Sequence, residues 1–143
     1  MNSRSLARDY LRKAKVRLQA LEFYRSAQDY SDVVREAQET VELSLRAILR
    51  MIGVEPPKVH DVGSLLKEYA DRLPGVPVPD LVHASTRLRK ERELAFYGDI
   101  DFLPQEQYGE EDAALAIKDA TAAVTAALRF AASCGIEEIE RQP

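Results

Sequence analysis

The chain has 143 residues, of which 45% are hydrophobic and 31% charged, and its formal net charge is −4 at pH 7. A chain of this length can bury a core without metals or disulfides, and the single cysteine, Cys134, excludes an internal disulfide. The negative net charge gives no overall attraction to nucleic acid, so any anion site must be local.

Export and membrane insertion are both disfavoured by the sequence. The first 15 residues carry charges where a signal peptide needs an unbroken apolar run. No stretch is long and apolar enough to span a bilayer. Together with the lone cysteine, these features predict a cytoplasmic protein that does not bind membranes.

Two long amphipathic helices are predicted for the first part of the chain. The first runs from about Ser3 to Ser26, with apolar residues at three- and four-residue steps from Ala7 to Leu21. The second runs from about Ser31 to Ile52. Gly53 and the two prolines that follow it predict the end of this helix.

Three further helices are predicted. A short one begins at Asp61, a good N-cap, and ends near Leu73, and residues 74–79 form a proline-rich connector. The fourth spans Asp80 to about Phe96. The fifth spans Glu110 to Ser133, and its acidic first turn suits the positive end of the helix dipole. Its many alanines allow close approach of neighbouring helices, so we expect it at the centre of the bundle.

Amphipathic helices joined by short connectors predict an all-α fold, an antiparallel up-and-down helical bundle of about five helices. We assign residues 1–134 to this bundle and residues 135–143 to a C-terminal tail. The two histidines and one cysteine lie far apart, and there is no Glu-x-x-His pair or Gly-rich phosphate loop. We therefore expect neither a metal site nor a cofactor.

The fourth predicted helix carries a charge among its apolar residues. Its inward stripe runs through Leu81, Ala84 or Ser85, Leu88, Arg92 and Ala95. A guanidinium is costly in such a position unless it is paired. Arg92 either pairs with a carboxylate of another helix or serves a binding site. Arg89 lies at the edge of the stripe, and Tyr97 and Asp99 follow at the helix end.

The second predicted helix offers polar side chains beside its apolar stripe. Gln38, Glu42 and Arg46 repeat every four residues. A solvent-facing pair explains Glu42 and Arg46, whereas Gln38 lies closer to the inward face and suits a polar role in a cleft. Neither His60, before the N-cap of the third helix, nor His83, in the first turn of the fourth, is expected to be a catalytic base.

These residues belong to a pattern that resembles the HEPN domain family. The matching positions are Ala37, Gln38, Glu42, Arg46, Gly53, Val54, Glu55, Pro56, Pro57, Lys58, His60 and Asp61. A second match is ERELAFYGD, followed by YGEEDAALAI at residues 108–117. The resemblance covers most of the chain to about residue 130. It implies a helical bundle that forms a homodimer, with a cleft where the second and fourth helices of two copies meet.

The resemblance also implies a choice between binding and RNA cleavage. Many relatives sit beside, or are fused to, a small nucleotidyltransferase. A large subset are metal-independent RNases, whose motif is an arginine, four intervening residues and a histidine. Here Arg92 occupies the arginine position, but Tyr97 stands in place of the histidine. A phenol with a pKa near 10 is a poor general base at neutral pH.

We therefore expect a binding protein that lacks the RNase histidine. The expected ligand is a nucleotide or RNA, which the guanidinium would hold by its phosphate and the tyrosine ring by stacking, or the partner is a nucleotidyltransferase. The candidate site comprises Arg92, Tyr97, Arg89, Asp99, Gln38 and Glu42, with no catalytic residue assigned. The alternative is a metal-independent RNase toxin of a toxin–antitoxin pair that uses Tyr97 or His60.

Overall fold

The computed structural model of the chain describes residues 3–56, 58, 62–97 and 107–136, and for residues 91–97 it describes the backbone alone. All regular structure in these residues is helical, which confirms the all-α prediction. The elements in chain order are α1 (Ser3–Ser26), α2 (Tyr30–Met51), α3 (Val62–Glu68), the 3₁₀ helix η1 (Ala70–Arg72), α4 (Val78–Tyr97) and α6 (Glu110–Ser133).

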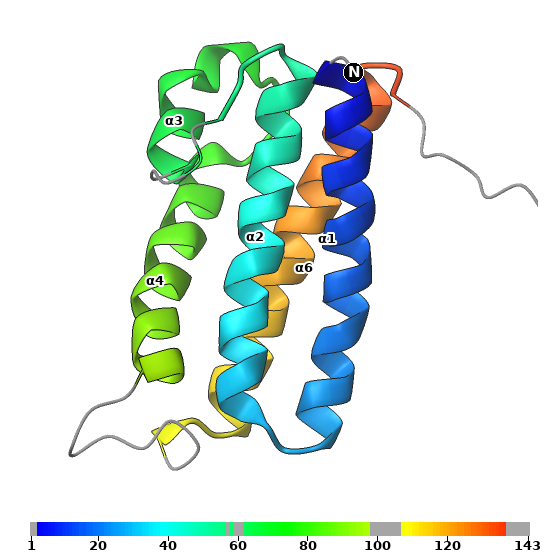
Figure 1. The fold of residues 1–143 in the computed structure, drawn as a ribbon. Helices are drawn as coiled ribbons and strands as arrows, with labels where there is room; N and C mark the ends of the chain where they lie inside the picture. The colour runs from blue at the N-terminus through cyan, green and yellow to red at the C-terminus, as the bar shows by residue number, and fades with distance from the viewer. Residues whose placement is uncertain (1–2, 57, 59–61, 98–106, 137–143) are drawn as a thin grey trace, which may run out of the picture.

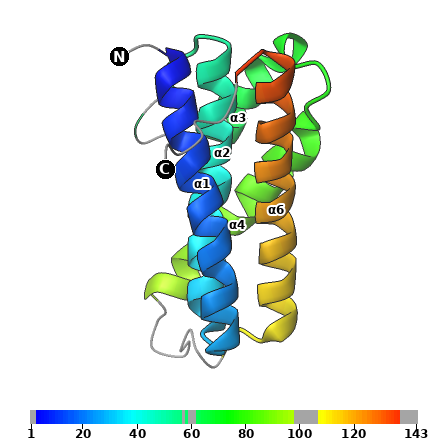
Figure 2. The ribbon, with the colours of Figure 1, turned by 90° about the vertical axis from the view of Figure 1, so that its right-hand side faces the viewer.

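The long helices form an antiparallel bundle with α2 at its centre. In Figure 1, α1 and α4 flank α2 on opposite sides, and α6 lies behind. Figure 2 shows α1 and α6 next to each other on the face that α4 does not cover. The most extensive helix–helix interface joins α1 to α2, and the next joins α2 to α6. α2 thus packs against every other long helix.

The placement of α6 differs from the prediction. Its alanines are buried along one side, including Ala120, Ala123 and Ala127, each with no exposed surface. The opposite side of the helix is exposed, with Ala122 and Lys118 among the residues facing solvent. Small side chains do allow close packing, but α6 buries only one face, whereas the broad apolar arc of α2 makes α2 the central helix.

The turn between α1 and α2 is short and well capped. Residues 27–29 connect the helices, and Gln28 adopts a left-handed conformation with φ of +60°. The Asp29 carboxylate accepts a hydrogen bond from the backbone N–H of Asp32 at 3.4 Å, which satisfies a donor of the first turn. A tight, capped turn fixes α1 and α2 as an antiparallel pair.

The other helix boundaries follow the predictions with two differences. α2 ends at Met51, just before the predicted stop at Gly53, whose φ of +79° suits glycine. The Gly53 N–H donates to the Arg50 carbonyl at 3.0 Å. α4 begins at Val78, two residues early, because Pro79 is tolerated in a first helical turn. The third predicted helix is divided into α3 and η1.

Candidate functional site

The inward stripe of α4 is buried as far as its side chains are described. Val78, Leu81, Ala84, Ser85 and Leu88 each have no more than 5% of their surface exposed. This confirms the predicted stripe and shows that both Ala84 and Ser85 belong to it. Arg92 follows Leu88 by one helical turn, and α4 continues through it to Tyr97.

Gln38 occupies the side of α2 that faces α4. Val34, one turn earlier in α2, lines a cavity together with Arg87 and Leu88 of α4, and Gln38 therefore lies at the same seam. The Gln38 side chain is 3% exposed, and its Oε1 atom has no hydrogen-bond partner among the described residues. A buried acceptor without a donor is rare and costly, because it has lost its water.

Ser85 is a second buried polar residue at this seam. It is 1% exposed, and its Oγ atom also lacks a hydrogen-bond partner among the residues described. α2 and α4 are antiparallel (Figure 1). Ser85, one turn before Leu88, and Gln38, one turn after Val34, therefore lie to the same side of the cavity that Val34 and Leu88 line. The α2–α4 seam thus holds two polar oxygens with unused hydrogen-bonding capacity.

A small cavity lies beside the seam, where α2, α4 and α6 meet. Its volume is about 100 Å³, and its lining includes Val34, Leu88 and Tyr108. Arg87 forms an ion pair with Asp119 of α6 across one wall. The Arg87–Asp119 pair ties α4 to α6 next to the seam.

Glu42 and Arg46 lie at the edge of the same face of α2. The Arg46 Nη2 atom is 3.9 Å from Glu42 Oε2, so the predicted pair forms. The two side chains are only 17% and 18% exposed, so they are less open to solvent than a surface ladder would be. Arg46 also donates a hydrogen bond to the Lys58 carbonyl at 3.4 Å, which connects α2 to the segment that follows it.

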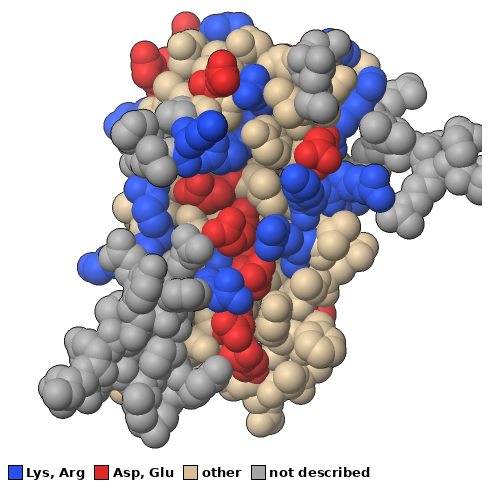
Figure 3. Space-filling model, in the orientation of Figure 1, with Lys and Arg blue, Asp and Glu red and all other residues tan. Residues whose placement is uncertain are grey.

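Acidic side chains follow the outer face of α2. Asp32, Glu36, Glu39 and Glu42 form this acidic row, and Figure 3 shows a central line of acidic side chains with basic ones to either side. Negative charge along α2 repels phosphate. A phosphate site on this face therefore has to lie away from the acidic row, towards the basic residues of α4.

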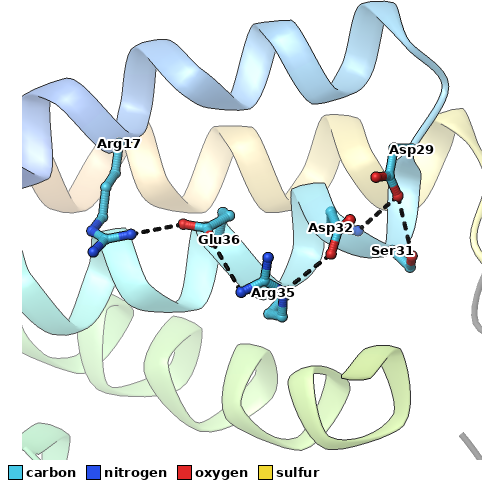
Figure 4. A network of polar contacts seen from close by, with 6 residues as sticks. All are labelled: Arg17, Asp29, Ser31, Asp32, Arg35 and Glu36. Carbon is cyan, nitrogen blue, oxygen red and sulfur yellow. Dashed lines mark hydrogen bonds and ion pairs between the residues drawn. The ribbon is translucent and has the colours of Figure 1, made fainter. Parts of the chain in front are cut away.

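Ion pairs hold the acidic row to its neighbours (Figure 4). Arg17 of α1 donates to Glu36 at 2.9 Å, and Arg35 lies 3.0 Å from the same carboxylate. Arg35 also donates to Asp32 at 3.1 Å. Asp32 has a raised pKa, first because its carboxyl hydrogen-bonds to that of Asp29 and second because it is partly buried.

A second ionic cluster joins three helices at one end of the bundle. Arg25 of α1 donates from Nε to Glu110 of α6 at 2.6 Å, and this hydrogen bond lowers the pKa of the Glu110 carboxyl. Burial raises the pKa of Tyr30 in α2, and the charge of Glu110, with which its side chain is hydrogen-bonded, raises it further. These groups stabilise the bundle and lie apart from the α2–α4 seam.

The predicted site residues are only partly brought together by the described structure. Gln38 and Glu42 share one face of α2, and Arg89 is half-buried on α4. The side chains of Arg92 and Tyr97, and the whole of Asp99 and His60, lie outside the described residues. His83 is exposed and lies in the second turn of α4, because this helix begins at Val78.

Two features of the site were not predicted from the sequence. The orphaned hydroxyl of Ser85 could be suspected only from a polar residue on an apolar stripe. The Arg87–Asp119 pair had a stronger signal, because Asp119 is the only acidic residue of α6 beyond its first turn. Among the described residues, no group of three or more His, Cys, Asp or Glu side chains is arranged to hold a metal ion.

Comparison with known proteins supplies the family. The sequence model described as the HEPN domain matches residues 7–130, which is most of the chain. The comparison with curated proteins finds no match. Within the described residues, no helix has both the length and the apolar character needed to cross a membrane.

Proposed function

The chain belongs to the HEPN family, and from this premise we propose that it is a dimeric binding protein without RNase activity. Its ligand carries a phosphate, as a nucleotide or an RNA strand does, and binds at the α2–α4 seam around Arg92 and Tyr97. HEPN domains are in general related to nucleic acids or RNase-like, and many form dimers. In this chain we assign the binding to the face where α2 meets α4, and we assign the ligand to the class that carries a phosphate.

The observation that carries the proposal is the buried Gln38 side chain. Its Oε1 atom accepts hydrogen bonds and finds no donor among the described residues. The missing donor is of the kind that a guanidinium or a nucleobase amino group supplies, and phosphate cannot supply it. A glutamine in this position suits the orientation of Arg92 or the recognition of a base, while the guanidinium itself holds the phosphate.

Binding without cleavage follows from the chemistry of Tyr97. RNA cleavage without a metal requires a group that exchanges protons near neutral pH, and an imidazole does so readily. A tyrosine hydroxyl has an ordinary pKa near 10, so it stays protonated. Loss of the histidine removes a rate enhancement on the order of 10²–10⁴-fold. Tyrosine can still stack on a base, which suits a binding role.

The proposal predicts that a panel of nucleotides and short RNAs contains a ligand that raises the melting temperature of the protein. Arg92→Ala combined with Tyr97→Ala should abolish this shift, because the phosphate and base contacts are both lost. The double variant should keep its helical circular dichroism and its molar mass in light scattering. Arg129→Ala, on the exposed face of α6, is the matched control and should leave the shift unchanged.

Three results would contradict the proposal. No shift with any nucleotide or RNA would remove the binding site and leave docking of a nucleotidyltransferase as the role of this face. Cleavage of labelled RNA that Arg92→Ala abolishes would replace binding with a toxin-like RNase activity. A shift that survives the double variant would place the ligand elsewhere on the molecule.

A further inference from the structure

A different face of the bundle carries apolar side chains in solvent. Within the described residues the large exposed hydrophobic side chains are Val16, Phe23 and Leu115, and the first two lie on α1. Val16 is 56% exposed and Phe23 is 73% exposed. Their separation of seven residues places them on one side of the helix, so they form a single surface.

Two alanines complete this surface. Val16, Ala20, Phe23 and Ala27 follow one another at steps of four, three and four residues, which is the spacing of a coiled-coil seam. We call these four residues the α1 seam. Val16, Ala20 and Phe23 lie in α1 and extend over about 10 Å, the rise of seven helical residues, and Ala27 follows in the turn just after the helix. A seam of this kind accepts the apolar side of another helix.

The α1 seam borders a groove that is already built. The groove lies between α1 and α2, has a volume of about 540 Å³, and is lined by Val16, Ala20 and Tyr24 together with charged residues. The Phe23 ring packs edge-on against the Tyr24 ring, with centroids 6.0 Å apart, which holds Phe23 beside the groove. The Arg17–Glu36 pair (Figure 4) joins the α1 side of the groove to its α2 side.

The charge around the seam identifies the partner. α1 contains seven basic and two acidic residues, a net charge of +5 in a chain whose net charge is −4. Figure 3 shows basic side chains over the upper half of α1 and mainly uncharged ones, in tan, over its lower half. The two acids in the groove are already paired, Asp9 with Lys13 at 3.3 Å and Glu36 with Arg17. Arg12 remains exposed at the rim.

From the seam, the groove and this charge we propose that the outer face of α1 binds an amphipathic helix of another protein, with apolar residues facing the seam and acidic residues facing Arg12 and Lys13. A second copy of this chain fits less well, because α1 stays net positive after Arg17 and Arg25 pair with Glu36 and Glu110 of other helices, and it would face another positive α1. RNA fits less well, because the centre of the surface is aliphatic and aromatic and its charges lie at the rim, as in protein interfaces.

The test uses a fluorescent synthetic helix of about three heptads, with leucine at its apolar positions and glutamate at the flanking positions. Anisotropy should show that the native protein binds this peptide and binds a lysine-flanked analogue at least tenfold more weakly. Phe23→Asp should weaken binding by roughly tenfold or more, because it places a charge in the apolar contact. Leu115→Asp is the matched control and should leave binding unchanged.

A charge reversal tests the partner's chemistry. Arg12→Glu together with Lys13→Glu should weaken the acidic peptide and strengthen the lysine-flanked one. These side chains and Phe23 are exposed, so each variant should melt like the native protein. Equal binding of both peptides, or no effect of Phe23→Asp, overturns the proposal.

The same variants show whether a second copy of the chain or an RNA occupies the α1 seam instead. If Phe23→Asp alone reduces the molar mass of the protein, the surface is a contact between copies. If the reversal at Arg12 and Lys13 abolishes RNA binding, the surface belongs to nucleic acid. Either result overturns the proposal, and neither depends on the Arg92/Tyr97 variants that test the α2–α4 site.

Discussion

Gln38 shows how one side chain can separate stability from binding. It is as buried as the leucines around it, yet its Oε1 atom lacks a donor among the described residues. A buried acceptor that receives no hydrogen bond lowers the free energy of unfolding by an amount on the order of 1–3 kcal/mol. Residues that cost stability in this way are typical of sites that bind something else.

Replacement of Gln38 by leucine should therefore raise the stability of the fold and weaken the binding of the ligand. Leucine fills a similar volume without a polar atom, so we expect the free energy of unfolding in urea to rise by about 1 kcal/mol. Nucleotide- or RNA-dependent stabilisation should fall in the same variant. A variant that loses stability while keeping its ligand would show that Gln38 is a structural residue.

At the scale of single elements, the close packing of α6 depends on alanine. Ala123 has no exposed surface, and α6 makes the second most extensive interface of the central helix. Because the interiors of proteins are closely packed, a larger side chain at Ala123 is expected to displace its neighbours. The neighbouring Ala122 is exposed, so the same substitution can be compared on the two faces of one helix.

Ala123→Leu should lower the free energy of unfolding by about 1–3 kcal/mol, because the added atoms force α6 away from the helices packed against it. Ala122→Leu should change it by less than about 0.5 kcal/mol, since the new side chain extends into solvent. Chemical denaturation of both variants measures the difference. Equal effects would mean that α6 is not closely packed at Ala123.

Most of the elements could be predicted from the sequence, and the reasons are local. Periodic apolar residues gave α1 and α6 their observed bounds, and Gly53 marked the end of α2. From the sequence, α6 rather than α2 is expected at the centre of the bundle. Which helix is central depends on how much of each helix surface is buried, and the amino-acid composition of a helix does not determine that. The apolar stripe of α4 was predicted correctly as far as Leu88. The unpaired Ser85 hydroxyl and the Arg87–Asp119 pair were not predicted, because they depend on contacts between helices that lie far apart in the sequence.

At the scale of the whole molecule, a cluster of ionisable groups ties three helices together at one end. The pKa of Glu110 in the folded protein lies below its ordinary value, because Arg25 donates a hydrogen bond to its carboxylate. A lowered carboxyl pKa stabilises the fold fully above the ordinary value. The contribution is lost as the pH falls from the ordinary value through the folded one.

The native protein should therefore be more stable than Glu110→Gln at pH 7, and the difference should shrink as the pH falls below about 4. Urea unfolding of both proteins between pH 7 and pH 3 measures this difference. Glu111→Gln, an exposed neighbour on the same helix, is the control and should follow the native curve more closely. A pH-independent difference would contradict the role of the charged carboxylate.

The tight turn between α1 and α2 has a consequence for the order of folding during synthesis. The helices that share the most extensive interface are joined by three residues, so their contacts close a short loop and can form early. α6, which makes the second most extensive interface of α2, is the last of these helices to be synthesised. Until α6 emerges, a folded α1–α2 hairpin exposes apolar surface, and this interval is when the nascent chain most needs protection from aggregation.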